Sequence, residues 1–436
     1  MGEWIDTEVA AERLGVKPAT LYAYVSRGVL QRRPDADGRR SLFDADEIEE
    51  LARRGRPRRP PSPTELAIES AITALGADRQ YYRGRDATEL AATSSFEEVA
   101  SWLWTGDQEP GEQKPGEGEA GEQEPGEDGP GEGEPDVDAV GGTWRAPEEG
   151  LAAAVAAQSG LPGDVLPLDR LQVITTALAA VDPLRFQLDR PGVIATARAL
   201  IAGLVDALPA AGEDADSTIA GRLWGRLSAR PPEPGLLRVA GAAMVLLADH
   251  ELAASTLAAR VAASVRADPY AVVAVGLGTV GGPLHGGASF GAERMFAEIG
   301  EPGRSGRVIG ERLRAGQRIP GFGHSIYKSG DRRASVLFDL IREVAPDHPW
   351  LAVADTVLTE AARRRLPEPN VDLALATLTS VAAMPPGSGE AIFAVARTAG
   401  WIAHALEEYE RTSPLRPRAI YVGPPLPPAA KRRTRS

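Results

Sequence analysis

The part of the chain after residue 62 is a long succession of alanine- and leucine-rich segments, each of helical length and each ended by glycine or proline. The alternation of β-branched and polar residues that strands require is scarce there. At 436 residues the chain can form two or three domains with a large core. The pattern predicts a mainly α fold, without the fixed-period repeat of a helical solenoid. We expect helices at residues 151–158, 169–181, 193–208, 236–265, 333–344, 351–366 and 391–409.

An acidic segment interrupts this helical region. Residues 107–138 hold 13 acidic residues and a single lysine, and the tripeptide Pro-Gly-Glu recurs along them. Because the segment has no apolar residue larger than alanine before Val137, and because its charges repel, it cannot form a core. We expect 107–143 to be a disordered insertion, with a binding role as the alternative. The formal net charge of −13 is concentrated there, so it does not exclude nucleic acid as a partner of the remaining chain.

Composition removes several other possibilities. The chain has no cysteine, so disulfides, thiolate metal ligands and thiol nucleophiles are excluded. The five histidines give no i,i+4 pair on one helix, and we therefore expect no metal site. The sequence has neither a signal-peptide pattern nor an apolar run of ~18 residues, which predicts a cytoplasmic protein that does not contact membranes.

A basic, proline-rich linker at residues 53–61 sets apart a small N-terminal unit at 1–52. In this unit we expect a helix at 7–14, a second helix at 19–27, a hairpin turn at 35–38 and a capped third helix that begins at Ser41. Helical spacing predicts that Thr20, Tyr24 and Arg27 face outward on the second helix. On the same spacing, Leu21 and Val25 pack inward.

The N-terminal unit resembles the winged helix-turn-helix of excisionase and mercury-resistance-type regulators. The resemblance rests on Glu8-Val-Ala-Ala, Leu14-Gly-Val and Thr20-Leu-Tyr. It implies that the second helix enters the DNA major groove and that arginines of the wing meet phosphates. A protein-docking module is the alternative. The candidate DNA contacts are Thr20, Tyr24, Arg27, Arg39 and Arg40.

The segment Gly276-Leu-Gly-Thr-Val-Gly281 matches the G-x-G-x-x-G pattern of dinucleotide-binding proteins. In those proteins the pattern follows a strand, leads at once into a helix and lies within βαβ alternation. Here Gly282-Pro-Leu-His follows, and no such alternation surrounds it. We therefore expect no dinucleotide cofactor.

Two histidines lie in glycine-rich segments, and a carboxylate precedes a later helix. His285 lies in Gly281-Gly-Pro-Leu-His-Gly-Gly, His324 in Pro320-Gly-Phe-Gly-His, and Asp372 in Pro369-Asn-Val-Asp. Glycine lets the backbone approach a ligand closely, a neutral imidazole can act as an electrophile, and nearby arginines can hold an anion. Each residue alone has a plainer structural reading, such as a helix N-cap for Asp372. Their combination predicts an acid–base site.

Ordered motifs between about residues 62 and 423 resemble the citrate synthase family. They are Asp249-His-Glu-Leu-Ala-Ala-Ser-Thr256, Gly282-Pro-Leu-His-Gly286, Gly321-Phe-Gly-His324 with Asp331 and Arg333, Pro369-Asn-Val-Asp372, Ala396-Arg-Thr-Ala-Gly-Trp-Ile-Ala-His404 and Arg416-Pro-Arg-Ala-Ile-Tyr-Val-Gly423. The resemblance implies a two-domain helical fold: a large domain at 62–287, a small domain at 288–394 and a return to the large domain at 395–436.

The resemblance also implies an activity, the condensation of acetyl-CoA with oxaloacetate to give citrate and CoA. Asp372 would remove a proton from the acyl methyl group, His285 would donate to the thioester oxygen, and His324 would polarise the ketone of oxaloacetate. Coenzyme A would enter as part of the substrate, and no tightly bound cofactor is implied. The residues implied to hold oxaloacetate are His250, Arg333, Arg397 and, from the second subunit of a homodimer, Arg416.

Three positions depart from the family pattern. Ala253 stands where Asn is usual, Arg332 where Pro is usual, and Leu373 where an aromatic residue often follows the aspartate. The last departure leaves open whether propionyl-CoA is also accepted, to give 2-methylcitrate. The second candidate function is a DNA-binding regulator in which the synthase body senses a metabolite. His348 and His404 are read as structural residues.

Overall fold

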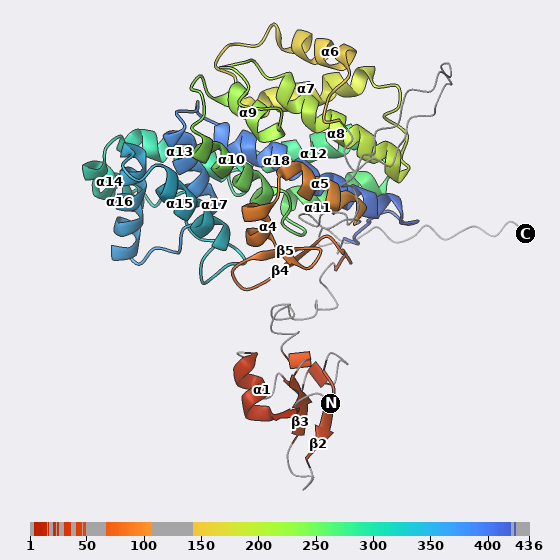
Figure 1. Cartoon of the computed structure of the whole chain (residues 1–436), viewed down its shortest axis with the longest axis vertical. Coiled ribbons are helices and arrows are strands. Elements are labelled where there is room, and N and C mark those ends of the chain that lie inside the picture. The colour runs from red at the N-terminus through yellow and green to blue at the C-terminus, as the bar shows by residue number, and fades with distance from the viewer. Residues whose placement is uncertain are drawn as a thin grey trace, which may run out of the picture.

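The computed structural model describes residues 4–14, 16, 21–22, 24–25, 30–35, 41–45, 47–48, 67–106, 143–419 and 423 (Figure 1). The basic linker and nearly all of the predicted acidic insertion lie outside these residues. Four of the candidate DNA contacts, Thr20, Arg27, Arg39 and Arg40, also lie outside them.

The N-terminal unit contains a three-stranded antiparallel sheet with the order β1-β3-β2 and a short helix. Its elements are β1 (Trp4–Asp6), α1 (Thr7–Arg13), β2 (Arg32–Pro34) and β3 (Ser41–Asp44). The Asp6 carboxylate caps α1 by accepting from the amides of Glu8 and Val9 at 3.0 and 2.9 Å. The antiparallel pairing of β2 with β3 confirms the predicted hairpin.

Two details of the N-terminal prediction are wrong. Residues 41–44 form strand β3, and the helix that we placed there begins only at Ala45. The cap of this later helix is Asp44, whose carboxylate accepts from the Glu47 amide at 3.3 Å. Tyr24 does not face outward: it is 5% exposed and belongs to the core of the unit with Leu21 and Phe43. The neighbouring Tyr22 is the exposed tyrosine.

The main body is helical, as predicted, apart from one small antiparallel sheet of β4 (Thr73–Leu75), β5 (Gln80–Tyr82) and β6 (Arg85–Asp86). Its helices are α4 (Ala87–Thr93), α5 (Phe96–Thr105), α6 (Glu148–Gln158), α7 (Pro167–Val181), α8 (Arg190–Asp206), α9 (Ile219–Leu227), α10 (Pro234–Leu247), α11 (Ala254–Ser264), α12 (Pro269–Val280), α13 (Gly287–Ile299), η1 (Pro302–Arg304), α14 (Ser305–Arg314), α15 (Arg332–Val344), α16 (Pro349–Arg363), α17 (Val371–Val381) and α18 (Ser388–Tyr409). None of the described helices combines the length and apolar character that a bilayer crossing needs.

Six of the seven predicted body helices are confirmed to within a few residues at each end. The exception is 236–265, which we predicted as one helix and which is divided into α10 and α11. Between them Glu251 adopts a left-handed conformation with φ 52°, and its amide donates to the Asp249 carboxylate at 3.0 Å. An aspartate that bonds the backbone two residues further on favours a turn over a helix, and this explains the break.

Helix α18 passes through the centre of the body and is buried along almost its whole length. It packs against α5, α7, α8, α10, α11, α12, α13 and α17 (Figure 1). Close approach to α12 depends on Gly276, because a Cβ atom there would lie 2.5 Å from a ring atom of Trp401. Helices α13 to α17 gather on one side of the body in Figure 1, in the region predicted as the small domain. The domain boundaries themselves remain a prediction.

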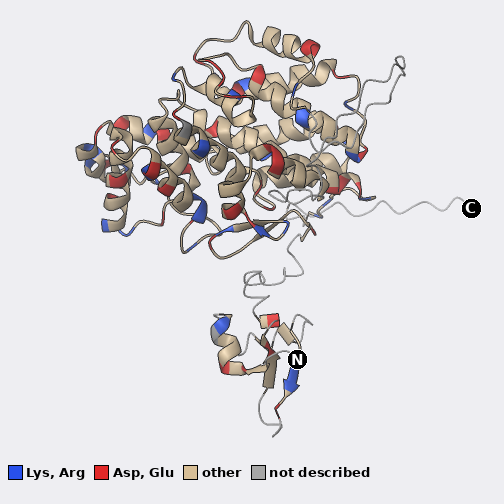
Figure 2. Cartoon of the chain, in the orientation of Figure 1, with Lys and Arg blue, Asp and Glu red and all other residues tan. Residues whose placement is uncertain are grey.

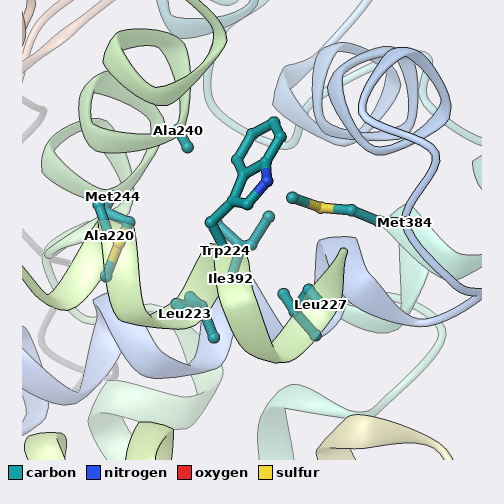
Figure 3. Close-up of a pocket in the computed structure, with 8 residues that line it drawn as sticks. All are labelled: Ala220, Leu223, Trp224, Leu227, Ala240, Met244, Met384 and Ile392. Atoms are coloured by element: carbon teal, nitrogen blue, oxygen red, sulfur yellow. The ribbon is translucent and has the colours of Figure 1, made fainter. Parts of the chain in front are cut away.

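A small apolar cavity lies next to α9 and α10 (Figure 3). The cavity has a volume of about 10 Å³ and is lined by Leu223, Trp224, Met244, Met384 and further apolar side chains. A space of this size holds at most one water molecule, and apolar walls leave such a water without partners. We therefore assign it no ligand.

Candidate active site

Five segments that are far apart in the sequence bring the predicted site residues together. The turn between α10 and α11 carries His250, the turn before α13 carries His285, and the loop before α15 carries His324. The first turn of α17 carries Asp372, and α18 carries Arg397. Each histidine therefore lies on a turn or loop, with helices to hold that segment in place.

His250 and His324 are in contact. Their ring centroids are 5.3 Å apart, with the rings at 73°. Tyr327 touches both: its hydroxyl lies 3.0 Å from Nε2 of His250, and its ring stacks on His324 at 4.6 Å. Burial, followed by the charges of Arg333 and Arg397, holds the pKa of His250 well below its usual range. His250 is therefore neutral at physiological pH.

Backbone amides decide which nitrogen of His324 carries the proton. The amides of Ile326 and Tyr327 both lie 3.1 Å from Nδ1. Because an amide can only donate, Nδ1 must accept, and the proton of the neutral ring sits on Nε2. Nη2 of Arg333 also faces Nε2, but at 3.5 Å, the outer limit of a hydrogen bond, so the two shorter amide bonds decide the tautomer. Burial, together with the charge of Arg333, lowers the pKa of His324 to about 4. His324 is thus a neutral imidazole that can donate through Nε2.

His285 has the opposite tautomer for the same reason. Its Nε2 faces the Ser255 amide at 3.4 Å and the Ser255 hydroxyl at 2.7 Å, and this hydroxyl also accepts from the Trp401 indole at 3.2 Å. Nε2 therefore accepts, and the proton sits on Nδ1. Burial, together with the charge of Arg397, lowers the pKa of His285 to about 4. His285 is a second neutral donor.

Asp331 joins the His324 loop to the helix that carries Asp372. Its carboxylate makes two bonds to the Arg333 guanidinium, at 2.9 and 2.8 Å, and accepts from the Val371 amide at 3.0 Å. Asn370 adds a second connection, since its side-chain amide donates to the Gly323 carbonyl at 2.8 Å. Arg333 was predicted to hold substrate, and in this structure it is already paired with Asp331.

Asp372 is a buried carboxyl group with spare hydrogen-bonding capacity. It is 9% exposed, and its Oδ1 atom has no hydrogen-bond partner among the described residues. Burial raises the pKa of Asp372 to about 7, against the opposing charges of Arg333 and Arg397. A carboxylate with such a pKa can take up a proton at neutral pH and release it again, which is what a general base requires.

Arg397 is the clearest sign of an anion-binding site. It is 1% exposed, and its Nε donates to the Leu247 carbonyl at 2.7 Å. Both terminal nitrogens, Nη1 and Nη2, are buried and lack hydrogen-bond partners among the described residues. A buried guanidinium with an open fork is costly unless a ligand completes it, and a carboxylate fits this fork in two parallel bonds.

Arg416 is not brought to the site within one chain. It lies in the exposed segment after α18 and makes no hydrogen bond or ion pair with the described residues.

Sequence reasoning missed Tyr327, although it follows His324 by only three residues. Its aromatic ring beside a glycine-rich loop was the available signal. In Figure 2 the ribbon of β2 in the N-terminal unit has the colour of basic residues, and Arg32 and Arg33 on this strand are exposed.

The sequence predicts neither a dinucleotide cofactor nor a metal site. The segment that would have to be a strand before the G-x-G-x-x-G pattern belongs to helix α12, so the pattern has no dinucleotide-binding context. Within the parts of the chain that the structure describes, no group of three or more histidines, aspartates or glutamates has the arrangement of a metal site.

The chain is similar to known proteins along most of its length. The sequence profile described as "Citrate synthase, C-terminal domain" matches residues 64–418. Citrate synthase 2 of Bacillus subtilis is 30% identical over 82% of this chain and 94% of its own length. The 2-methylcitrate synthase 2 of Corynebacterium glutamicum is 27% identical over 78% of this chain and 88% of its own length. The crystal structure of citrate synthase from Thermotoga maritima has a TM-score of 0.63 and 28% identity, covering 82% of this chain and 94% of that one.

The fold and the matches along most of the chain thus define an enzyme of the acyltransferase class. The chain belongs to the citrate synthase family. It carries one addition: residues 4–56 match the profile described as "Helix-turn-helix domain".

Proposed function

We propose that this chain condenses acetyl-CoA with oxaloacetate to give citrate and free CoA, and that it does so in the cytoplasm. The observation that carries the proposal is the open, buried guanidinium fork of Arg397 near the neutral histidines His250 and His285. Oxaloacetate is a small dicarboxylate with a ketone, so it can complete the fork and accept a hydrogen bond at its ketone oxygen. Arg333 and His250 complete the proposed oxaloacetate site.

The first chemical step is removal of a proton from the methyl group of acetyl-CoA. Asp372 takes this proton, and the electron pair moves toward the thioester oxygen, where Nδ1–H of His285 donates a hydrogen bond or a proton. The product is an enol, or a strongly hydrogen-bonded enolate, in place of a bare anion. The lowered pKa keeps His285 neutral, so it acts on the thioester oxygen as an uncharged donor, and the raised pKa makes Asp372 a stronger base than an ordinary carboxylate.

The second step forms the carbon–carbon bond. The enol carbon attacks the ketone carbon of oxaloacetate, while Nε2–H of His324 stabilises the oxygen that becomes the hydroxyl of the product. Water then hydrolyses the thioester, and citrate and CoA are released. The bond broken is the C–S bond, and the thiolate takes up a proton to leave as free CoA.

We further propose a homodimer in which Arg416 of a second copy completes the carboxylate site. Support comes from the exposed position of Arg416 and from exposed apolar side chains on α11 and α12, which pack together. Val261 and Val275 are 42% and 41% exposed, and Val265 directly after α11 is 65% exposed. Apolar groups grouped in this way favour burial against another chain.

The test is release of free CoA thiol from acetyl-CoA by the purified full chain, with and without oxaloacetate. We expect release only when oxaloacetate is present, loss of release in Asp372→Asn, and loss of oxaloacetate binding in Arg397→Gln. A parallel series with propionyl-CoA decides whether 2-methylcitrate is also made. Thiol release that does not need oxaloacetate, or an active Asp372→Asn variant, would contradict the proposal.

A second candidate function is regulation through DNA. It is favoured by the helix-turn-helix match and by the two exposed arginines of β2. In this case the full chain should retard duplex DNA from upstream of its own coding region, and Arg39→Ala with Arg40→Ala should weaken the retardation. Unchanged retardation by the double variant would show that the wing arginines do not contact DNA. If the wild-type chain does not retard DNA, this candidate function is wrong.

A further inference from the structure

Beneath the proposed oxaloacetate site lies a buried chain of polar side chains that the mechanism does not use. Asp249, Arg260 and His404 are each 0% exposed, and Glu408 is 1% exposed. Burial of so many ionisable groups is costly unless each finds a partner. Their connection therefore needs an explanation beyond helix packing.

His404 is the central member of this chain. Its Nδ1 lies 2.7 Å from Nη1 of Arg260, and its Nε2 lies 3.3 Å from Oδ2 of Asp249. An arginine can only donate, so Nδ1 accepts and the ring proton sits on Nε2, from which it is donated to Asp249. Arg260 is held in turn by Glu408, whose Oε1 lies 2.7 Å from its Nε, and by Glu407. The ring of His404 is thus fixed from both sides.

Asp249 connects His404 to the turn that carries His250. The same Oδ2 atom accepts from the Glu251 amide and so holds the left-handed residue that forms the turn. The Tyr82 hydroxyl bonds the backbone of Asp249 as well, with both its amide nitrogen and its carbonyl oxygen at 3.2 Å. His250 therefore sits between anchored residues on either side.

The turn also lies directly on α18, close to Arg397. The amide of Gly400, three residues after Arg397, donates to the Ala248 carbonyl at 2.9 Å. A Cβ atom at Gly400 would lie 2.3 Å from Oδ1 of Asp249, so only glycine permits this approach. Burial lowers the pKa of Arg397 to about 10, and the nearby Asp249 carboxylate opposes this effect.

We propose that Asp249 and His404 are positioning residues of the oxaloacetate site, which fasten the turn carrying His250 to the helix carrying Arg397. This inference rests on the proposed function, since it concerns the binding of the same substrate. It predicts that loss of the His404 connection weakens oxaloacetate binding more than acyl-CoA binding, because Ser255 and the loop of His285 have their own bonds.

The test compares variants of the full chain in the thiol-release assay, with the KM of each substrate measured separately. His404→Leu should raise the KM for oxaloacetate about tenfold, as expected when binding weakens by ~1.4 kcal/mol. It should change the KM for acetyl-CoA less than about twofold. His404→Gln should restore most of the loss, because the glutamine oxygen can accept from Arg260 while its nitrogen donates to Asp249.

Two further variants make the outcome decisive. Asp249→Asn keeps the shape of the side chain and should also raise the KM for oxaloacetate but not that for acetyl-CoA. This variant therefore tests the inference if His404→Leu does not fold. Thr398→Val is the matched control on α18: Thr398 is buried, and among the described residues its hydroxyl bonds only the Ala394 carbonyl of its own helix, at 3.0 Å. This variant should leave both KM values unchanged.

Equal changes in both KM values, or no change in folded His404→Leu and Asp249→Asn, would overturn the inference. Failure of glutamine to restore what leucine removes would also overturn it. If the wild-type chain does not release CoA with oxaloacetate, the proposed function fails instead. Calorimetric titration with oxaloacetate alone would then still test the inference, since it reports binding without catalysis.

Discussion

Replacing Asp372 by asparagine should abolish CoA release and, at alkaline pH, stabilise the folded protein. The reason lies in the burial of the carboxylate, which raises its pKa from 3.8 to about 7. An acid whose folded-state pKa is raised makes folding less favourable as the pH rises from 3.8 through about 7, because the folded state resists ionisation. Above pH 7 the penalty levels off at ~4 kcal/mol. Asparagine has nearly the same shape and cannot ionise, so it avoids this penalty.

The measurement is urea unfolding of wild type and Asp372→Asn, followed by tryptophan fluorescence at several pH values. The advantage of the variant in free energy of unfolding should grow by roughly 3 kcal/mol between pH 5 and pH 8.5. Other titrating groups are shared by both proteins and cancel in the difference. Wild-type CoA release should rise with pH through about 7, as Asp372 ionises. An advantage that is independent of pH, or a variant that is less stable at pH 8.5, would refute the reasoning.

Three smaller predictions concern neighbouring residues. Tyr327→Phe removes the 3.0 Å bond to His250 and should raise the KM for oxaloacetate about fivefold in the thiol-release assay, as expected for loss of ~1 kcal/mol; an unchanged KM would show that stacking alone holds His324. Gly276→Ala places a methyl group against Trp401 and should cost about 1–3 kcal/mol of unfolding free energy, measured in urea, and it should slow CoA release because Trp401 bonds Ser255. Leu223→Ala enlarges the small cavity and should cost about 2–5 kcal/mol without changing KM; a cost below 1 kcal/mol would mean that the cavity collapses.

Much of the fold and the site could be predicted from local patterns. Regular alanine- and leucine-rich segments predict α7, α8 and α18 well because burial and propensity agree there. His285, His324 and Asp372 were identifiable because glycine-rich turns and a capped helix start leave recognisable residues around them. Such signals are local in sequence.

The failures have equally specific causes. The break at Asp249 contains neither glycine nor proline. The sequence does not show whether an aspartate lies within a helix or, like Asp249, accepts from the backbone two residues further on and so forms a turn. Tyr24 was placed on the wrong face because a helix of two turns offers too few positions to fix its orientation. His404 is buried, as its reading as a structural residue implies, but its partner Arg260 lies 144 residues away in the sequence and could not be predicted. Partnerships over such distances leave no trace in local spacing.

The proton positions on the imidazoles of His285 and His324 are determined largely by the main chain. Peptide N–H groups at 255, 326 and 327 face the ring nitrogens that must stay unprotonated. No exchange of one side chain for another, short of proline, can delete a peptide N–H. The residues around each ring can therefore change widely in evolution while the same ring nitrogen keeps the proton. The condition is that the local turn keeps its shape.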